Sequence, residues 1–526
     1  MARKAKNKEP KKKTLSELEA ALWKSADKLR GSVDPTEYKY VVLSLIFLKY
    51  ANDKFDEHRE KLIADGKKNF LEITSFYTKD NVFYIPEKAR WDYLKSVAKE
   101  AGLALKIDKA LHAIETKNKS LAGALPNNYF SRLNLNNASL GSLLDKIASI
   151  SQYKVEDGDV FGHVYEYFLK AFAMQEGKKK GEFYTPKTVV QTLCELIEPY
   201  KGICYDGACG SGGMFVSSME FINAHKGSRK NISIYAQESN QTTMQLSKMN
   251  LAIRGIACNM GEKAASTFTD DQHPDLKADY ILMNPPFNLK DWRDEDELTG
   301  DARWKGYEVP APSNANYAWL LNAVAKLSDN GVAGILLANG ALGSDDGPDP
   351  KIRRQLIEND LVEAIIVLPR NMFYTTDISC TIWILNKNKN AHHVQFDGID
   401  RDLRNRHNKV LFVDLRTKGH EGTKKHIEFD ETERKKIVNL YHSWQTGEGY
   451  EDVPELCYSA KKEEIASNDY SLVPSKYIEF VDHDMDIDYS NEMARIQKEM
   501  HDIVREEKES QKMLEDAFRG IGYGID

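Results

Sequence analysis

Between residues 202 and 387, short apolar runs rich in β-branched side chains alternate with stretches long enough to form helices. The runs predicted to be strands span residues 202–205, 232–238, 279–284, 331–339, 361–369 and 380–387. Strands in such an order pair in parallel when the intervening helices cross over the sheet and cover both of its faces. The alternation therefore predicts an α/β fold with a doubly wound, largely parallel sheet, whose ligands bind outside the carboxyl ends of the strands.

The segments that flank this region differ from it in composition. Residues 1–13 carry charge and no core-forming side chains, which predicts a disordered basic arm. From residue 14 to 155, apolar positions recur every three or four residues, which predicts a helical N-terminal domain. We expect the α/β domain to span residues 156–480. The tail, residues 481–526, is predicted to be a charged helix whose apolar stripe docks on a partner or on its own domain.

Composition limits what the chain can bind and where it works. A formal net charge of −7 and a pI near 6.1 show that the chain is no polycation, so nucleic acid would need a local basic surface or a partner protein. The six cysteines form no C-x-x-C pair, which argues against a zinc ribbon or a disulfide framework. No apolar run is long enough to span a bilayer. The expected localisation is the cytoplasm.

Two predicted strands end in residues that suit a nucleotide-like ligand. The first is followed by "DGACGSGGMF" (206–215), where glycines allow a tight turn and let a ligand approach the backbone. This sequence is neither G-x-G-x-x-G nor a P-loop. Glu238 ends the next strand, where an acid can accept hydrogen bonds from a ribose diol. Each feature alone fits an ordinary loop, but together they point to a ligand with an adenosine-like ribose.

The segment "GEFYTP" (181–186) precedes a helical stretch upstream of the first strand. Thr185 is suited to cap that helix, with Pro186 at its first position. Capping leaves unexplained why two aromatic residues, Phe183 and Tyr184, stand beside a polar turn.

The strand at 279–284 ends in Asn284, Pro285, Pro286 and Phe287. A proline pair can simply mark a loop. A chemical interpretation explains more: the Asn284 amide oxygen and the Pro285 carbonyl can each accept one hydrogen of the exocyclic amine of a purine. Two such bonds would free the nitrogen lone pair, and Phe287 offers a ring for the base to stack on. A base in a duplex reaches such a turn only when it is flipped out.

Taken in order, "GEFYTP", "DGACGSGGMF", the acid and "NPPF" resemble an adenine-specific DNA methyltransferase that uses S-adenosyl-L-methionine. The sequence most resembles the modification (M) subunit of type I restriction–modification systems. "RGSVDPTEYKYVVLSLIFLKY" (30–50), "YEYFLKAFA" (165–173) and "SNANYAWL" (313–320) share this resemblance, which covers nearly the whole chain from residue 14. It implies a helical N-terminal domain, a Rossmann-like methyltransferase domain and a C-terminal helical tail.

The resemblance also implies roles for individual residues. The target adenine would be bound by Asn284, Pro285, Pro286 and Phe287. The cofactor would be bound by Glu182, Phe183, Tyr184, Thr185, Pro186, Lys187, Asp206, Ser211, Gly212, Gly213 and Glu238. No metal ion is expected, because a sulfonium gives up its methyl group by in-line displacement, for which positioning supplies most of the acceleration. One departure is that the family often has Asp-Pro-Ala where this chain has Asp206, Gly207 and Ala208.

The implied assembly contains two M subunits, one specificity (S) subunit and restriction (R) subunits, acting on double-stranded DNA and not at a membrane. The sequence has neither a separate basic domain nor the motifs of a nuclease or helicase, as expected if other chains supply those functions. Two alternatives remain at this point. One is methylation of a protein glutamine amide, since NPPY-type turns also hold planar amides. The other is a non-catalytic scaffold, against which the intact Asn284, Phe287 and Glu238 argue.

Two stretches lack a regular pattern. Residues 288–316 are longer than most loops of compact domains, and loops of that length are usually functional or disordered. Trp292 and Trp304 favour a mobile flap that orders over the flipped base, with a plain surface insertion as the alternative. After residue 390 we expect irregular chain with one recognisable strand, at 409–415.

Overall fold

The computed structural model describes residues 14–27, 35–133, 135–153, 155, 158–176, 185–224, 228, 231–373, 377–396, 398–422, 426–481 and 489–520. The chain divides into two compact units, Met1–Ile478 and Glu479–Asp526. None of the helices in the described ranges is both long enough and apolar enough to cross a membrane.

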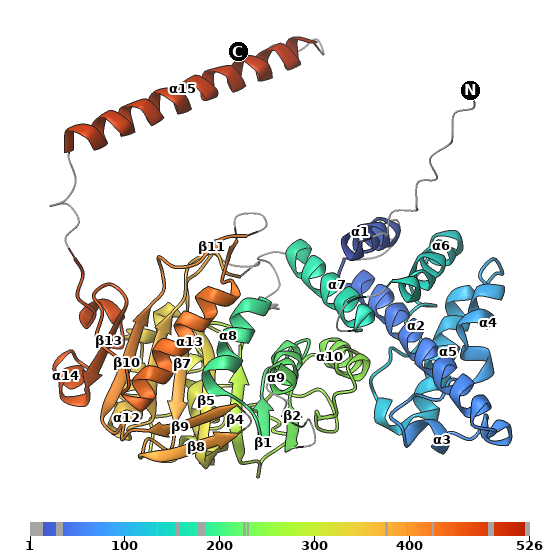
Figure 1. Cartoon of the computed structure of the whole chain (residues 1–526), viewed down its shortest axis with the longest axis horizontal. Helices are drawn as coiled ribbons and strands as arrows, with labels where there is room; N and C mark the ends of the chain where they lie inside the picture. The colour runs from blue at the N-terminus through green and yellow to red at the C-terminus, as the bar shows by residue number, and fades with distance from the viewer. Residues whose placement is uncertain are drawn as a thin grey trace, which may run out of the picture. The chain divides into compact units, whose positions relative to one another are not determined.

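The first unit starts with a bundle of helices, drawn in blue and teal in Figure 1. They are α1 (Leu15–Ala26), α2 (Pro35–Ala64), α3 (Ser75–Thr78), α4 (Trp91–Ser96), α5 (Leu103–Lys117), α6 (Asn137–Ala148) and α7 (Val160–Glu176). Thr14 and Glu17 form a capping box that starts α1. The apolar core of the bundle also includes Leu246, Met249 and Ile253, which belong to a helix of the α/β region, α10 (Gln241–Ile253). The two parts of the unit therefore share one packed interface.

A nine-stranded sheet follows, with the strand order β13-β10-β6-β7-β5-β4-β1-β2-β3. The strands are β1 (Gly202–Asp206), β2 (Ile232–Ala236), β3 (Cys258–Asn259), β4 (Ala278–Met283), β5 (Leu327–Ala338), β6 (Val362–Val367), β7 (Cys380–Asn386), β10 (Lys409–Asp414) and β13 (Cys457–Lys461). β7 runs antiparallel to both β5 and β6, and β13 runs antiparallel to β10. The other pairs are parallel. The predicted α/β class and its Rossmann-like sheet are confirmed.

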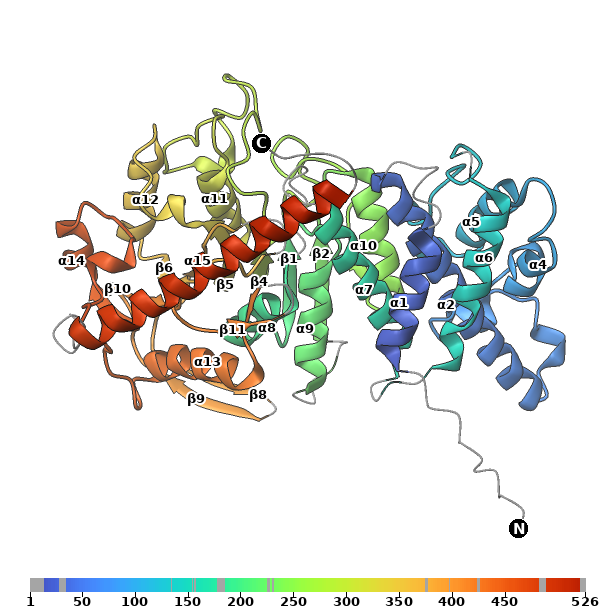
Figure 2. The same ribbon diagram turned by 90° about the horizontal axis from the view of Figure 1, so that it is seen from above.

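Helices cover both faces of this sheet. α8 (Lys187–Ile197), α9 (Gly213–Ala224) and α13 (Glu431–Thr446) lie on one face, while α11 (Asn316–Lys326) and α12 (Asp349–Glu358) lie on the other (Figure 1, Figure 2). Neighbouring strand residues point to opposite faces, so Leu282 joins the core beneath α8 while Ile281 and Met283 join the core beneath α11. This explains why the strands read as continuous apolar runs.

The predicted strand at 409–415 is confirmed by β10, but the prediction that the rest of the chain after residue 390 is irregular is wrong. β8 (His392–Phe396) and β9 (Ile399–Leu403) form a hairpin, β11 (His420–Glu421) pairs with β12 (Ile427–Glu428), and α13, β13 and α14 (Lys462–Ser467) follow. Residues of the β8–β9 hairpin alternate between half-buried and exposed, so they lack the apolar run that identifies a core strand. In α13 the buried Ile437, Tyr441 and Trp444 recur at helical spacing but stand among charged residues.

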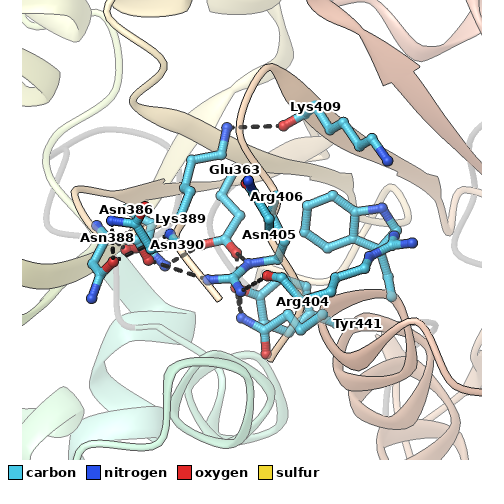
Figure 3. Close-up of polar contacts among 12 residues, drawn as sticks. Glu363, Asn386, Asn388, Lys389, Asn390, Arg404, Asn405, Arg406, Lys409 and Tyr441 are labelled. Carbon is cyan, nitrogen blue, oxygen red and sulfur yellow. Dashed lines mark hydrogen bonds and ion pairs between the residues drawn. The ribbon is translucent and has the colours of Figure 1, made fainter. Parts of the chain in front are cut away.

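A buried ion pair lies at the edge of the sheet opposite the carboxyl ends of its parallel strands (Figure 3). Arg406 and Glu363 are both fully buried, and the Arg406 Nε donates to a Glu363 oxygen at 2.6 Å. The Arg406 guanidinium also donates to the carbonyls of Arg404 and Asn388, and the Asn386 amide donates to the other Glu363 oxygen. The network links β6, β7 and the segments that lead into β8 and β10, and it replaces the water that both charges would lose on burial.

The second unit contains α15 (Tyr489–Gly520), which has no buried residue. The predicted C-terminal helix is confirmed over these residues. Its exposed apolar side chains are Tyr489, Met493, Ile496, Met500, Ile503, Val504, Met513, Leu514 and Phe518.

Candidate active site

The three predicted ligand-binding segments meet at one edge of the sheet. β4, β1 and β2 are neighbours in the sheet and run in parallel, so the residues after each strand emerge side by side. The backbone joins two of these segments, because the Gln237 N–H donates to the Asp206 carbonyl at 2.9 Å and the Cys209 N–H donates to the Gln237 carbonyl at 3.1 Å. Residues that are distant in the sequence thereby form one surface.

The turn after β1 depends on glycine. Gly210 and Gly212 have φ angles of +52° and +79°, a region that other residues rarely adopt. A Cβ on Gly212 would lie 2.8 Å from the Ser247 hydroxyl, so the packing of α10 against the turn also excludes a side chain. The Gly210 N–H donates to Glu238 at 3.1 Å, which ties the turn to the acid after β2.

Glu238 and Asp206 place two carboxyl groups beside this turn. Glu238 accepts N–H bonds from Gly210 and, at 2.8 Å, from Asn240, and it also accepts from the Ser239 hydroxyl at 3.4 Å. Asp206 is buried and accepts from the Ala208 N–H at 2.9 Å. Burial raises the pKa of Asp206 to about 8; the bond from Ala208 opposes this rise, and the charge of Glu238 adds to it. Asp206 is therefore largely protonated at neutral pH.

Two adjoining cavities open onto these residues. The larger, of about 580 Å³, has the size of a cofactor pocket. Its lining includes Gly210, Ser211, Glu238, Ser266, Phe268, Asn284, Pro286 and Trp292, with Lys39, Leu169 and Phe172 from α2 and α7. The smaller is lined by Thr185, Lys187, Asp206, Ser211, Gly213, Asn250 and Asn284, among others. Both cavities reach Asn284, so the turn after β4 lies where they meet.

Asn284 has one satisfied end and one unsatisfied end. Its Nδ2 donates to the Thr185 hydroxyl at 2.7 Å. Its Oδ1 is buried and accepts no hydrogen bond from any residue that the structure describes. A buried acceptor without a donor costs about 1–3 kcal/mol, so an orphan of this kind in a cavity wall indicates a ligand that supplies the donor.

The other residues of the turn are placed differently. Pro286 lines the larger cavity. Phe287 is half-buried and makes an edge contact with Phe373, at 6.0 Å between ring centroids. Neither Pro285 nor Phe287 lines the two cavities, and the roles given to them from the sequence stay predictions.

The "GEFYTP" segment is described only at its end. Glu182, Phe183 and Tyr184 lie outside the described residues. The capping role expected for Thr185 is wrong: Pro186 directly precedes the first residue of α8, Lys187, and no side chain caps the helix. The Thr185 hydroxyl instead accepts from Asn284.

Lys187 forms an ion pair with Glu220 at 3.1 Å, in the wall of the smaller cavity. Of the glycines carried over from the resemblance, Gly213 lines that cavity, while Gly212 packs beneath the turn against α10.

Residues 288–316 are folded against the domain, and the tryptophans that favoured a flap are buried. Trp292 and Trp304 are 7% and 2% exposed and form an aromatic cluster with Phe268 and Trp319. Arg293, also buried, donates to four backbone carbonyls of the same segment. The loop therefore has a small core of its own, and Trp292 forms part of the cavity wall, while the flap over a flipped base stays a prediction.

Sequence reasoning missed two groups of cavity residues. The N-terminal helices contribute Lys39, Leu169 and Phe172 to the cavity wall. The apolar spacing of these helices identifies a core without showing which residues face a cavity. Ser266 and Phe268 follow β3, a two-residue strand without an apolar run. The one sign in the sequence that Ser266 and Phe268 return to the carboxyl edge of the sheet is that they follow the strand that ends at Glu238.

Two known families match this sequence. N-6 DNA Methylase matches residues 156–486, more than half of the chain. The HsdM N-terminal domain matches residues 18–147, which contain most of the helical bundle.

Relatives with similar sequences are methylase subunits. The chain is 38% identical over 461 residues to the type I restriction enzyme HindI methylase subunit of Haemophilus influenzae, covering 84% of this chain and 100% of that protein. It is 32% identical over 531 residues to the type I restriction enzyme MjaIX methylase subunit of Methanocaldococcus jannaschii, covering 96% of this chain and 92% of that protein.

A solved structure shows the same fold. The type I restriction-modification system methyltransferase subunit from Streptococcus thermophilus has a TM-score of 0.72 at 24% identity, covering 89% of this chain and 100% of that chain. The family match and the relatives agree. The chain belongs to the N-6 DNA methylase family of DNA methyltransferases, and within it to the methylase subunits of type I restriction–modification systems.

Proposed function

We propose that this chain methylates the 6-amino group of adenine in double-stranded DNA, with S-adenosyl-L-methionine as the methyl donor. The observation that carries the proposal is the buried Oδ1 of Asn284, an acceptor without a donor at the meeting point of two cavities. An exocyclic amine supplies the missing donor. The neighbouring Pro285 carbonyl offers a second acceptor, so both amine hydrogens are engaged and the nitrogen lone pair is freed.

The residues at the sheet edge suit the cofactor. Glu238 lines the larger cavity and is the proposed acceptor for a ribose diol, the turn from Gly210 to Gly213 lets the backbone approach a ligand, and the protonated Asp206 carboxyl can donate a hydrogen bond to the cofactor. When bound, the cofactor supplies an electrophilic methyl group on a positively charged sulfur, so the reaction needs no metal ion. Asn284 orients the amine and takes no proton; the amine proton leaves to solvent.

The target base must leave the duplex to reach Asn284. Phe287 is the proposed stacking partner of the flipped adenine; stacking of a base on an aromatic ring is worth about 1–3 kcal/mol. Its edge contact with Phe373 leaves it half-buried.

The experiment compares wild type with Asn284→Ala, using labelled S-adenosyl-L-methionine, plasmid DNA and the specificity subunit. We expect label at adenine in the wild-type reaction and none above background in the variant. Asn330→Ala, an exposed asparagine on β5, is the matched control and should label DNA like wild type. Equal labelling by Asn284→Ala would remove the amine-binding role. Label in protein instead of DNA would favour glutamine methylation, and no transfer at all would favour a scaffold.

We further propose that α15 docks on the specificity subunit, with two M subunits per S subunit and R subunits in the full complex. The support is its exposed apolar side chains, which a partner would cover, and the acidic character of the chain, which leaves sequence reading to another subunit. The test is co-purification with the S subunit. Met500→Glu with Ile503→Glu should abolish binding, whereas Glu507→Lys with Glu509→Lys should not. Binding that survives loss of α15 would refute the proposal.

A further inference from the structure

The hydroxyl of Thr185 contacts the side chain of Asn284, which lies 99 residues later in the chain. We infer that Thr185 is a positioning residue that holds the Asn284 amide at the place where its oxygen meets the target amine. This inference rests on the proposed function, in which Asn284 accepts a hydrogen bond from that amine.

The Asn284 amide has two ends that differ in chemistry more than in shape. Its oxygen and its NH2 group are nearly equal in size, so the cavity alone hardly distinguishes two orientations related by half a turn. In one orientation Oδ1 faces the amine and accepts from it. In the other, NH2 faces NH2 and no hydrogen bond forms. A hydroxyl on the far side can accept from Nδ2 or donate to Oδ1, so it anchors the amide in either orientation, and the target amine, which only donates, binds the one with Oδ1 towards it.

Thr185 is that group in this structure. Its Oγ1 lies 2.7 Å from Asn284 Nδ2, while Oδ1 is left buried and without a donor among the described residues. The hydroxyl does not cap α8, so its position is not explained by the start of the helix. Thr185 and Asn284 both line the smaller cavity, so the contact lies within the site.

A second role has to be separated from this one. As a lining residue, Thr185 could instead act through cofactor affinity alone. The two roles predict different measurements. Loss of a cofactor contact weakens binding and is overcome by saturating cofactor. Loss of the contact that holds the amide lowers the rate of methyl transfer at saturating cofactor and leaves the cofactor dissociation constant unchanged.

The test uses the full chain with its specificity subunit and compares Thr185→Val, which keeps the shape, with Thr185→Ser, which keeps the hydroxyl. Single-turnover transfer to DNA at saturating S-adenosyl-L-methionine gives the rate, and calorimetry with S-adenosyl-L-homocysteine gives cofactor affinity. We expect Thr185→Val to lower the rate about tenfold with unchanged affinity, and Thr185→Ser to recover most of it. Thermal unfolding checks folding, and Thr185→Ala replaces Thr185→Val if valine is not accommodated.

The matched control is Thr188→Val, one turn further along α8. The Thr188 hydroxyl is also buried, but it has no hydrogen-bond partner among the described residues, so its loss should leave the rate unchanged.

Two results would overturn the inference: a wild-type rate in Thr185→Val, or a weaker cofactor affinity that fully accounts for the slower transfer. A wild-type chain that transfers no methyl group to DNA would instead refute the proposed function. The two failures are therefore distinguishable.

Discussion

At the scale of single residues, Asp206 shows a carboxyl group whose surroundings oppose its charge. Burial raises its pKa to about 8, whereas an aspartate in an unfolded chain has a pKa near 3.9. The folded state therefore holds a proton that the unfolded state has lost. Since the folded-state pKa is the higher one, the stability that this proton contributes is complete below about pH 4 and is lost as the pH rises towards about 8.

Asp206→Asn keeps the shape of the side chain and an acceptor for the Ala208 N–H but cannot ionise. We expect the free energy of unfolding to fall between about pH 5 and about pH 8 by more in wild type than in this variant. Urea unfolding at both pH values measures the difference. The exposed Asp296→Asn should follow wild type, and an equal fall in Asp206→Asn would contradict a buried proton.

The sequence predicts single residues of the site unevenly. Glu238, Asp206 and Asn284 can be predicted to lie together because each stands at the end of its own strand, and the order of parallel strands brings such ends together. The bond between Thr185 and Asn284 could not be found in this way. Local rules assign a threonine before a helix to capping, and only the folded chain shows that the hydroxyl serves a residue 99 positions away.

At the scale of elements, the buried pair of Arg406 and Glu363 connects β6 to the segment that precedes β10 (Figure 3). Removing one partner leaves an uncompensated buried charge, which costs about 3–5 kcal/mol. We expect Arg406→Met to lower the free energy of unfolding by about this amount, and Arg406→Met with Glu363→Leu to lower it by less. Urea unfolding measures both.

A matched control for this pair is Arg132→Met, which removes a surface arginine that lies 3.7 Å from Glu37 and is 66% exposed. Its loss of stability should be well below that of Arg406→Met, because exposed pairs contribute little. If Arg406→Met were as stable as wild type, this result would show that water reaches the site of the ion pair.

The same elements show where sequence patterns stop being informative. Strands of the central sheet were predicted because both of their faces are buried, so their apolar runs are unbroken. Arg406 stands in a charged stretch that resembles an exposed loop, yet it is fully buried. Its burial follows from a tertiary network, and no local pattern encodes that network.

At the scale of the whole molecule, the N-terminal helices and the sheet domain are joined by α10. Leu246, Met249 and Ile253 of that helix are 1–3% exposed and pack in the core of the helical bundle. Leu169 of α7 also lines both cavities of the site. The bundle therefore forms part of the wall of the candidate active site and shares its core with the α/β region.

A chain that begins at residue 156 should fail to fold as a stable monomer, because it exposes the apolar side of α10 and part of α7 to water. We expect it to aggregate and to lose cofactor binding, measured by light scattering and calorimetry. A chain lacking residues 489–520 is the matched control: α15 has no buried residue, so this chain should keep the thermal stability and cofactor affinity of the full chain. A monomeric, cofactor-binding chain from residue 156 would contradict the shared core.

Because α10 belongs to the α/β region and packs in the core of the helical bundle, it also limits which parts of two related proteins can be joined in a chimera. A chimera joined near residue 155 would combine the helical bundle of one relative with the α10 of another. The side chains at positions 246, 249 and 253 would then have to pack against helices from a different protein. A workable chimera must therefore carry Leu246, Met249 and Ile253 from the same parent as the bundle. In the history of this family, the junction between the two domains is expected to have been inherited as a block even where the surrounding sequence diverged.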